Sequence, residues 1–397
     1  MLIAHFCDYG LENSNNRFNY IAQLLNEKGM DVELVTSSFS HRDKTQRKEY
    51  DSKKYKTTLI YEPSYKKNVS LKRFFYSHYI MSRNLKKYLQ SCEKPDVVYC
   101  AIPSLDVAYV TKQYAERNDI PFIVDVQDLW PEAFQMVFNI PILSNIIFSP
   151  LRKKADRVYQ SADEIVAVSQ TYAERAMHSN NKCKKAQIIY LGTDLHMYDE
   201  NAKKDIQLRK DEDCIWLAYC GTLGHSYDLT RVFNVLKILT QKQAENYKFI
   251  VMGDGPLRET YETYARENKL PVVFTGKLKY DEMCATLSKC DICINPISPG
   301  AAQSIINKHA DYAASGLPVI STQENQEYKD LVESYEMGFN CDKCSDEEMA
   351  DTIEDLFVNR EKRKKMGINA RKCAKDLFDR GRTYMQVVRL IEETMKS

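Results

Sequence analysis

Short apolar runs alternate with amphipathic segments along almost the whole chain. The amphipathic segments repeat with the 3.6-residue period of helices, and the runs have the length of buried strands. The runs are 2–6, 32–37, 57–61, 97–102, 121–126, 164–169, 187–191, 216–221, 249–253, 272–276, 292–297 and 318–322. Strands that are apolar on both faces are typical of parallel sheets covered by helices on both sides. The pattern therefore predicts a doubly wound α/β fold.

The alternation breaks once, at residues 192–214, which are polar and charged without apolar periodicity. A break of this kind indicates a domain boundary. Seven runs precede it and five follow it, so we expect two facing Rossmann-like domains with a cleft between them. The expected bounds are 1–195 for the first domain and 196–380 for the second, and the helical pattern of 381–397 allows that segment to pack back onto the first.

Charge and composition narrow the class of protein. Lys and Arg number 56 against 55 Asp and Glu, so the basic excess of nucleic-acid-binding proteins is missing. Asp8 interrupts the first apolar run and no positive leader precedes it, so we expect a cytoplasmic protein whose twelve cysteines are free thiols. Zinc is a minor alternative for the C-x-x-C pairs Cys290/Cys293 and Cys341/Cys344, because the first pair would point to opposite faces of a strand.

Glycine-rich turns follow three of the runs in the second half. They are CGTLG at 220–224, GDGP at 253–256 and NPISPGAAQS at 295–304. Ligands bind beyond the carboxyl ends of parallel strands, where glycine lets the backbone approach an anion. The candidate residues of the first two turns are Gly221, Thr222, Gly224, Gly253, Asp254 and Gly255. Because all three turns would meet at one edge of the sheet, they predict a site for a phosphate-rich ligand.

The helix predicted after the third turn carries a polar stripe. Ser304, Lys308, Asp311 and Ser315 are spaced four, three and four residues apart, which places them on one helical face. An exposed Lys308–Asp311 pair would be an ordinary surface feature, worth ~0.3 kcal/mol. The neighbouring glycines favour the other interpretation, in which the start of the helix and the Lys308 ammonium face a phosphate.

The sequence lacks the motifs of several common ligand-binding and catalytic sites. GDGPLR has the first two glycines of a dinucleotide fingerprint without the third, and no P-loop is present. The sequence also contains no G-x-S-x-G, H-E-x-x-H or EF-hand pattern. The predicted phosphate site therefore has no dedicated metal cage.

The same stretches resemble a known family. CGTLG, MGDGPLR, VVFTGKL and CDICINPI, followed by SIINKHADYAASGLPVISTQ, resemble the donor half of family 4 glycosyltransferases. The first half is similar through VDVQDLWPE at 124–132 and ADEIVAVSQ at 162–170. The resemblance covers nearly the whole chain and is strongest in 216–328. It implies a GT-B fold and retaining transfer from a sugar nucleotide, without metal or cofactor, in the synthesis of bacterial surface polysaccharides.

The resemblance also implies roles for single residues. The two glutamates that the family usually has eight residues apart correspond here to Gln303 and Asp311, and Asp311 can still accept hydrogen bonds from ribose hydroxyls. The family's Arg and Lys after the first strand of this domain correspond to Thr222 and Tyr227, so the diphosphate loses two cations. Lys308 is our candidate for replacing that charge.

Main-chain groups are expected to complete the donor site. Backbone N–H groups at the start of the striped helix would bind the diphosphate, and those of the turn after 272–276 would hold the base. The residues concerned are Ser304, Ile305 and Ile306 for the diphosphate, and Gly276, Lys277 and Leu278 for the base.

The acceptor half has weaker signals. Asp128 directly follows a predicted strand, where the family often has a His–Asp pair and this chain has Gln127–Asp128. Asp128 could orient or deprotonate an acceptor hydroxyl, or it could cap a helix that begins near Trp130, and both interpretations stay open. Gly10 is expected to close over the diphosphate from the first domain. No partner pattern assigns a role to His5, His41, His78 or His309.

Residues 42–88 are basic with interleaved aromatic side chains, a composition that can sit on anionic lipid. The stretch 133–151 is free of charges, but Pro141 and Pro150 make it a poor transmembrane helix. Together the two segments favour peripheral contact with the cytoplasmic face of a membrane, with a solvated loop and helix as the alternative. RNA binding is disfavoured, because the basic character does not extend along the chain.

The sequence thus predicts transfer of a hexose from a nucleoside-diphosphate sugar, with UDP favoured by the family resemblance, to a glycan or lipid-linked acceptor. Lys308 and Asp128 are the catalytic candidates. Two alternatives are a sugar-nucleotide 2-epimerase and a non-catalytic protein that binds a sugar nucleotide within an assembly. The epimerase would need acid–base carboxylates and histidines that the sequence does not reveal.

Overall fold

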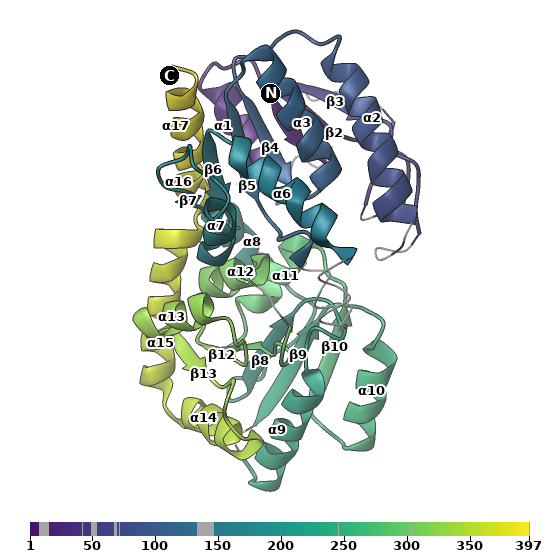
Figure 1. The fold of residues 1–397 in the computed structure, drawn as a ribbon. Helices are drawn as coiled ribbons and strands as arrows, with labels where there is room; N and C mark the ends of the chain where they lie inside the picture. The colour runs from purple at the N-terminus through teal and green to yellow at the C-terminus, as the bar shows by residue number, and fades with distance from the viewer. Residues whose placement is uncertain are drawn as a thin grey trace. The chain divides into compact units, whose positions relative to one another are not determined.

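Two parallel β-sheets organise the chain in the computed structural model (Figure 1). One belongs to unit 1, Met1–Tyr190 with Arg382–Ser397, and the other belongs to unit 2, Leu191–Gly381. Two α/β units, each built on a parallel sheet, confirm the predicted fold class. The structure describes residues 1–7, 16–41, 43–48, 54–66, 70, 72–132, 147–244, 246–301 and 304–396.

The sheet of unit 1 has seven strands in the order β3-β2-β1-β4-β5-β6-β7, and every pairing is parallel. The strands are β1 Leu2–Ala4, β2 Glu33–Ser37, β3 Lys56–Ile60, β4 Val98–Ile102, β5 Phe122–Val126, β6 Glu164–Ala167 and β7 Gln187–Ile188. Each overlaps one of the seven apolar runs that precede the polar break.

Helices cover both faces of this sheet, because successive strand residues bury alternate sides. One buried cluster joins the strands to α2, α3, α6 and α7, and a second joins them to α1 and α17. The helical elements are α1 Arg17–Glu27, the π-helix η1 Lys72–Ser77, α2 His78–Leu89, α3 Leu105–Asn118, α6 Ser149–Ser161, α7 Gln170–Met177 and α17 Met385–Thr394. The C-terminal helix α17 therefore packs beside α1, at the start of the chain.

The sheet of unit 2 has six parallel strands in the order β10-β9-β8-β11-β12-β13. The strands are β8 Ile215–Cys220, β9 Tyr247–Met252, β10 Val272–Gly276, β11 Ile292–Asn295, β12 Val319–Ser321 and β13 Gly338–Asn340. Five of them overlap predicted runs, and β13 was missed. The order reverses between β8 and β11, which is the switch point where such sheets bind ligands.

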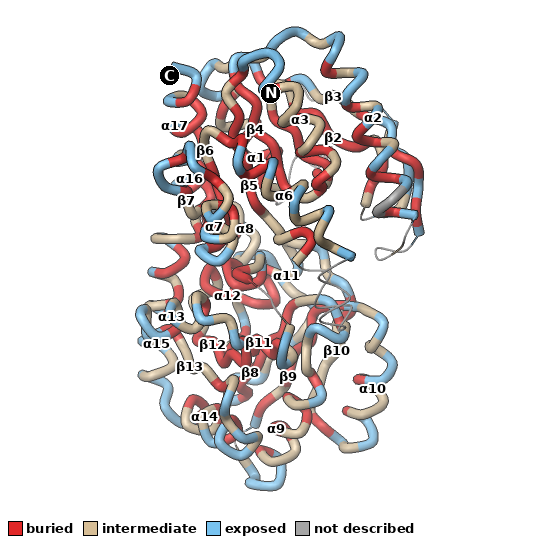
Figure 2. Tube along the Cα trace, viewed as in Figure 1, coloured by how far each residue is buried: buried red, intermediate tan, exposed pale blue. Residues whose placement is uncertain are grey.

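Helices also cover the sheet of unit 2. α9, α10 and α14 enclose one buried cluster, and α12 packs against α8, α11 and α15. Figure 2 shows that α12 is buried over most of its length, from Lys308 to Ala314, like the central strands. The helical elements are α8 Leu195–Ala202, α9 Leu229–Gln241, α10 Arg258–Glu267, α11 Tyr280–Leu287, α12 Asn307–Ser315, α13 Gln326–Ser334, α14 Asp346–Val358, α15 Arg360–Cys373, the π-helix η2 Ala374–Phe378 and α16 Arg380–Thr383.

A buried ion pair links the layers of unit 1. The Arg17 guanidinium, on α1, lies 2.8 Å from the carboxylate of Asp125, on β5, and both side chains are almost fully enclosed. Asp125 also accepts a hydrogen bond from the Tyr99 hydroxyl, and Arg17 donates to the carbonyl oxygen of Ile189. The pair therefore ties α1 to β4, β5 and the segment after β7.

Some predicted features lie outside the described residues. Gly10 and Gln303 are among them, as is most of the apolar stretch 133–151, of which the description resumes at Ile147. Within the part of the chain that the structure describes, no helix has both the length and the apolarity needed to cross a bilayer.

Candidate functional site

The first two glycine turns of unit 2 lie directly against each other. The amide of Gly221 donates to the carbonyl oxygen of Met252, and the amide of Leu223 donates to that of Asp254, each at 3.0 Å. A side-chain carbon at Gly253 would lie 1.8 Å from the carbonyl oxygen of Gly221, and one at Gly255 would lie 2.4 Å from that of Leu223. Only glycine allows this approach, so the turns after β8 and β9 form one surface at the switch point.

The helix α12 begins later than the polar stripe suggested. Ile306 is its extended N-cap and Asn307 its first residue, so residues 304–306 precede the helix. The Ile306 amide donates to Nδ1 of His309 at 3.1 Å, and burial holds the pKa of His309 well below its usual value, so the ring stays neutral and can accept. The prediction that the helix starts at Ser304 was therefore wrong: it starts at Asn307, and Nδ1 of His309 caps the Ile306 amide.

Lys308 is enclosed at the centre of this site. Its side chain is 8% exposed, and its Nζ has no hydrogen-bond partner among the described residues. Nζ lies 3.7 Å from the ring centroid of Tyr227 and 4.9 Å from that of Tyr219, and a side-chain carbon at Gly221 would lie 3.8 Å from it. Burial lowers the pKa of Lys308 well below its ordinary value. The alternative of an exposed Lys308–Asp311 surface pair is therefore wrong.

Asp311 points into a separate buried network. Its Oδ1 accepts a hydrogen bond from the Tyr280 hydroxyl at 3.0 Å, and that hydroxyl lies 2.5 Å from the hydroxyl of Thr193. Burial raises the pKa of Asp311 to about 6, while Tyr280 and the nearby Arg380 oppose the rise. Asp311 thus remains mostly ionised near neutral pH. No sequence pattern pointed to Tyr280 or Thr193, because both come from segments distant from Asp311 in the chain.

Further unpartnered polar atoms surround the start of α12. Ser304 Oγ and Asn295 Oδ1 are buried without a hydrogen-bond partner among the described residues. The Asn295 amide nitrogen lies 3.0 Å from Ser321 Oγ and 3.1 Å from Gln323 Oε1, and the Gln323 amide donates to the Ser304 carbonyl oxygen. These contacts fix the third turn at the ends of β11 and β12.

The turn after β10 brings in a cation that the sequence did not single out. Gly276 has a φ of +73°, and a side-chain carbon there would lie 3.2 Å from the Arg258 guanidinium. Arg258 also pairs with Glu262 at 2.7 Å and with Asp254 at 3.5 Å. Lys277 is exposed at the same turn. Arg258 is the last residue of the GDGPLR motif, so the basic residue at that position is the sequence feature that could have identified it.

In unit 1, Asp128 follows β5 at the carboxyl edge of the sheet. Its carboxylate accepts a hydrogen bond from Nε1 of Trp130 at 3.1 Å, and burial raises its pKa. The ring of Trp130 stacks on His78 at 5.6 Å and lies 5.4 Å from the Arg73 guanidinium. Asp128 is thus held within an aromatic and basic cluster, most of which came from residues to which the sequence assigned no role.

Beside this cluster lies a buried network that could be mistaken for a metal centre. The polar atoms of His5, Glu62 and His78 lie within 4.8 Å of one another. Glu62 already pairs with His5 at 2.8 Å and accepts hydrogen bonds from Ser37 and Ser77, each at 2.6 Å. Burial alone would raise the pKa of Glu62, but these partners lower it to about 2. The carboxylate is satisfied by the protein itself, so we assign the network to structure.

Comparisons with known proteins decide the family. Residues 15–196 match the family described as "Glycosyltransferase Family 4", and residues 200–373 match "Glycosyl transferases group 1". The chain belongs to these glycosyltransferases. None of the curated proteins matches the glycosyltransferase significantly.

Solved structures share the fold of the glycosyltransferase at low identity. HepE of Anabaena in complex with UDP is 15% identical, with a TM-score of 0.69 and 99% of each chain covered. Sucrose-phosphate synthase of Thermosynechococcus elongatus is 15% identical, with a TM-score of 0.71 over 99% of this chain and 98% of its own. WaaG, a glycosyltransferase involved in lipopolysaccharide biosynthesis, is 14% identical, with a TM-score of 0.65 and 98% of each chain covered. All three are GT-B neighbours.

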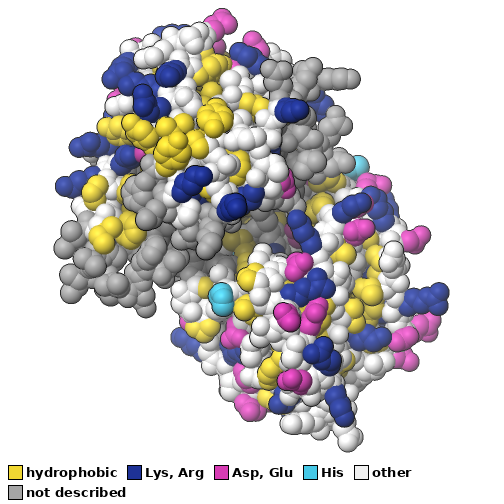
Figure 3. All heavy atoms as spheres, turned by 90° about the vertical axis from the view of Figure 1, so that its right-hand side faces the viewer, with side chains coloured by type: hydrophobic (Ala, Val, Ile, Leu, Met, Phe, Trp, Pro, Cys, Tyr) yellow, Lys and Arg dark blue, Asp and Glu magenta, His cyan; other side chains and the backbone are white. Residues whose placement is uncertain are grey.

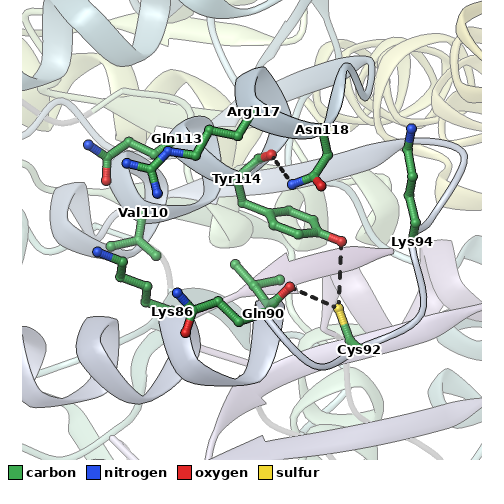
Figure 4. A pocket seen from close by; sticks show the side chains of 10 residues that line it. Lys86, Gln90, Cys92, Lys94, Val110, Gln113, Tyr114, Arg117 and Asn118 are labelled. Carbon is green, nitrogen blue, oxygen red and sulfur yellow. Dashed lines mark hydrogen bonds between the residues drawn. The ribbon is translucent and has the colours of Figure 1, made fainter.

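A hollow of about 350 Å³ lies elsewhere on unit 1 of the glycosyltransferase, between α2 and α3 (Figure 4). Lys86, Lys94 and Arg117 line it, and Cys92 Sγ lies 3.7 Å from the Tyr114 hydroxyl. Both helices end just before a strand begins, so the hollow is at the amino edge of the sheet, opposite the edge where ligands bind. Helix dipoles favour cations at these C-terminal ends, and we assign the hollow no part in transfer.

The contact between the first two turns leads to a stability prediction. Gly253→Ala is expected to lower the free energy of unfolding by about 3 kcal/mol, because the added carbon must displace the Gly221 carbonyl. Urea unfolding would measure it. Gly224→Ala is the matched control, since its added carbon meets only the Thr222 side chain at 3.7 Å. Equal stability of the two variants would contradict the close packing of the turns.

Proposed function

We propose that this glycosyltransferase transfers a sugar from a nucleoside-diphosphate sugar, with uridine as the base, to a glycan or lipid-linked acceptor with retention of configuration. One observation carries the donor half of the proposal: a buried, unpartnered lysine amine beside the Gly221 turn, at the switch point of unit 2. Negative charge grows on the phosphate oxygens as the nucleoside diphosphate departs. An ammonium held in place without hydrogen-bond partners can receive that charge with little reorganisation.

The other donor groups follow from the same geometry. The start of α12 offers main-chain N–H groups and the positive end of its dipole to the diphosphate. Asp311 is proposed to hold the ribose, and the main chain of Gly276–Leu278 the base, with Arg258 beside it. The departing phosphate itself then assists the acceptor hydroxyl, so the reaction needs no metal or other cofactor.

The acceptor is proposed to bind at the carboxyl edge of the sheet in unit 1. Asp128 is the candidate group for orienting or deprotonating its hydroxyl, and the raised pKa of this carboxyl suits a proton acceptor. The aromatic rings around Arg73 would pack on the apolar face of a sugar ring. WaaG, which has the same fold, is described as acting in lipopolysaccharide biosynthesis, and surface polysaccharide synthesis is the role we propose here.

The test combines binding with product analysis. The purified protein is titrated with UDP, GDP and their glucose-linked forms while its thermal unfolding is followed, since a ligand raises the unfolding temperature only if it binds the folded state. Labelled UDP-sugars are then incubated with the protein and membrane extract, with and without EDTA. Label on lipid or glycan, insensitive to EDTA, supports the proposal. Release of a free epimer indicates the 2-epimerase, and binding without any product indicates the assembly protein.

Membrane contact is proposed for the surface formed by the end of β3, η1 and α2. Tyr61, Tyr76 and Tyr79 are at least half exposed there. Figure 3 faces the side that carries these elements and shows hydrophobic side chains among Lys and Arg. The described exposed cations of the segment include Lys66, Lys72, Arg83, Lys86 and Lys87. Apolar rings combined with clustered cations fit a bilayer that contains anionic lipid.

Replacing Tyr76 and Tyr79 together with serine is expected to weaken binding to vesicles of mixed neutral and anionic phospholipid about tenfold, through the loss of ~1.4 kcal/mol. Co-sedimentation measures the bound fraction. The matched control replaces Val358 and Ile368, which are similarly exposed in unit 2, and should bind like the wild type. Two results would overturn the proposed surface. One is equal vesicle binding by the wild type, the tyrosine variant and the control. The other is wild-type binding to purely neutral vesicles that is as strong as its binding to mixed vesicles.

A further inference from the structure

We propose that Tyr227, together with Tyr219, is a positioning residue that holds the Lys308 ammonium in place for the donor diphosphate. This inference rests on the proposed function and deepens it, because it explains how a single cation is kept at the site. Nζ lies 3.7 Å from the centroid of the Tyr227 ring and 4.9 Å from that of Tyr219. Both distances are within the range of cation–π attraction.

The two rings form a preformed clamp. Their centroids are 5.7 Å apart and their planes are inclined by 65°, so the rings meet edge to face. The Tyr219 hydroxyl donates to the carbonyl oxygen of Thr222 at 2.8 Å, which fixes that ring beneath the turn after β8. An edge-to-face pair anchored in this way has little freedom to reorient when Lys308 changes partner.

The main chain of Tyr227 is held from three sides. Its amide donates to the carbonyl oxygen of Gly224, its own carbonyl oxygen accepts from the Tyr261 hydroxyl at 3.1 Å, and an isolated bridge pairs it with Ile297. Tyr227 therefore joins the turn after β8 to the turn after β11. The residue that faces Lys308 is also the one that connects the two turns of the switch point.

The clamp has a specific chemical consequence for the lysine. A ring face attracts the ammonium but accepts no conventional hydrogen bond, so the N–H groups of Nζ that point away from the rings stay available to phosphate oxygens. A carboxylate partner would instead compete with the diphosphate. Cys220 also acts electrostatically on Lys308, and this residue is buried. The rings thus direct the cation toward the Gly221 turn without neutralising it.

The experiment compares substitutions at Tyr227 by calorimetric titration with UDP, with GDP titrated in parallel. Tyr227→Phe keeps the ring face and should bind UDP within about twofold of wild type, whereas Tyr227→Leu should bind about tenfold more weakly. The matched control is Tyr264→Leu, which removes a half-buried tyrosine that stacks on Phe233, away from the turns. It should leave UDP affinity unchanged. Thermal unfolding verifies that each variant is folded.

A double-mutant cycle separates positioning from general damage. In a Lys308→Met background the clamp has no cation to hold, so Tyr227→Leu should cause no further loss of UDP affinity. An equal loss in both backgrounds would overturn the clamp and make Tyr227 a structural residue. Wild-type affinity of Tyr227→Leu would also overturn it, while the proposed function stands. Failure of the wild-type protein to bind either nucleotide would overturn both.

Discussion

Replacing Lys308 with methionine is expected to lower kcat/KM for the sugar nucleotide about 100-fold and, at the same time, to make the protein more stable. The activity falls because a preorganised cation is lost where negative charge develops in the transition state. The stability rises because the buried amine has no hydrogen-bond partner, and we expect the desolvation penalty relieved at constant volume to exceed the lost cation–π attraction by about 1 kcal/mol. Steady-state kinetics and urea unfolding measure the two changes.

Activity and stability are expected to change in opposite directions, which distinguishes this prediction from simple structural damage. If Lys308 served only packing or surface charge, its substitution would lower the stability of the protein or leave it unchanged. Lys237→Met is a matched control, since Lys237 is a half-buried lysine on α9 with no place in the proposed site, and it should retain activity. Wild-type turnover in Lys308→Met would return Lys308 to a purely structural role.

The same lysine makes nucleotide affinity depend on pH. Burial lowers the pKa of Lys308 in the free protein, and a bound diphosphate favours the charged form, so its pKa rises on binding. Binding then takes up a proton between the two pKa values. Affinity is full below the lowered pKa and falls about tenfold per pH unit above it, until the pKa of the complex is reached. The UDP phosphate itself titrates near pH 6, so the titrations belong above that pH.

The ionisable groups near Lys308 are not expected to produce the same fall in UDP affinity with rising pH. The ionisable groups beside the amine are Cys220, Tyr219 and Tyr227, with His309 and Asp311 on its own helix. Burial raises the pKa of Cys220 and Tyr219, lowers that of His309, and raises that of Asp311 only to about 6. Lys308→Met should therefore abolish the pH dependence, and a slope that survives in this variant would assign it to another group.

The fold could be predicted from the sequence because it depends on local hydrophobic patterns. Buried parallel strands must be short apolar runs, and twelve such runs became strands β1 to β12. β13 was missed because Gly338–Asn340 has only three residues, one of which is glycine and one asparagine. A side-chain carbon at Gly338 would lie 2.0 Å from the Val319 carbonyl oxygen, so this strand forms through close backbone packing that no hydrophobic pattern records.

The candidate site could be predicted only in part, because its most important contacts join residues that are far apart in the sequence. The spacing placed Lys308 near the glycine turns, but the rings of Tyr219 and Tyr227 that enclose its amine precede it by 89 and 81 residues. The role of His309 as a cap depends on where the helix starts, which periodicity does not define. The aromatic and histidine cluster of unit 1 likewise joins residues after β1 and β5 to the start of α2, a proximity that only the tertiary fold creates.

The largest loss of stability is expected from Asp125→Ala in unit 1. The substitution leaves the Arg17 guanidinium buried without its carboxylate, and breaking a pair of this kind typically costs about 3–5 kcal/mol. It also deprives the Tyr99 hydroxyl of its acceptor. The chain has two tryptophans, Trp130 in unit 1 and Trp216 in unit 2, so urea unfolding followed by fluorescence in a Trp216→Phe background reports unit 1 alone.

Two comparisons show whether that loss comes from the uncompensated charge. Glu116→Ala removes the exposed partner of the half-buried Lys112 in a surface pair on α3, and should change the free energy of unfolding by about 0.5 kcal/mol or less. Replacing Arg17 with methionine and Asp125 with leucine together removes both charges, and should be less damaging than Asp125→Ala alone, because no ion is left unpaired. If the double variant is instead the less stable of the two, the pair stabilises unit 1 through its hydrogen bonds and packing, and the desolvated guanidinium is not the cause.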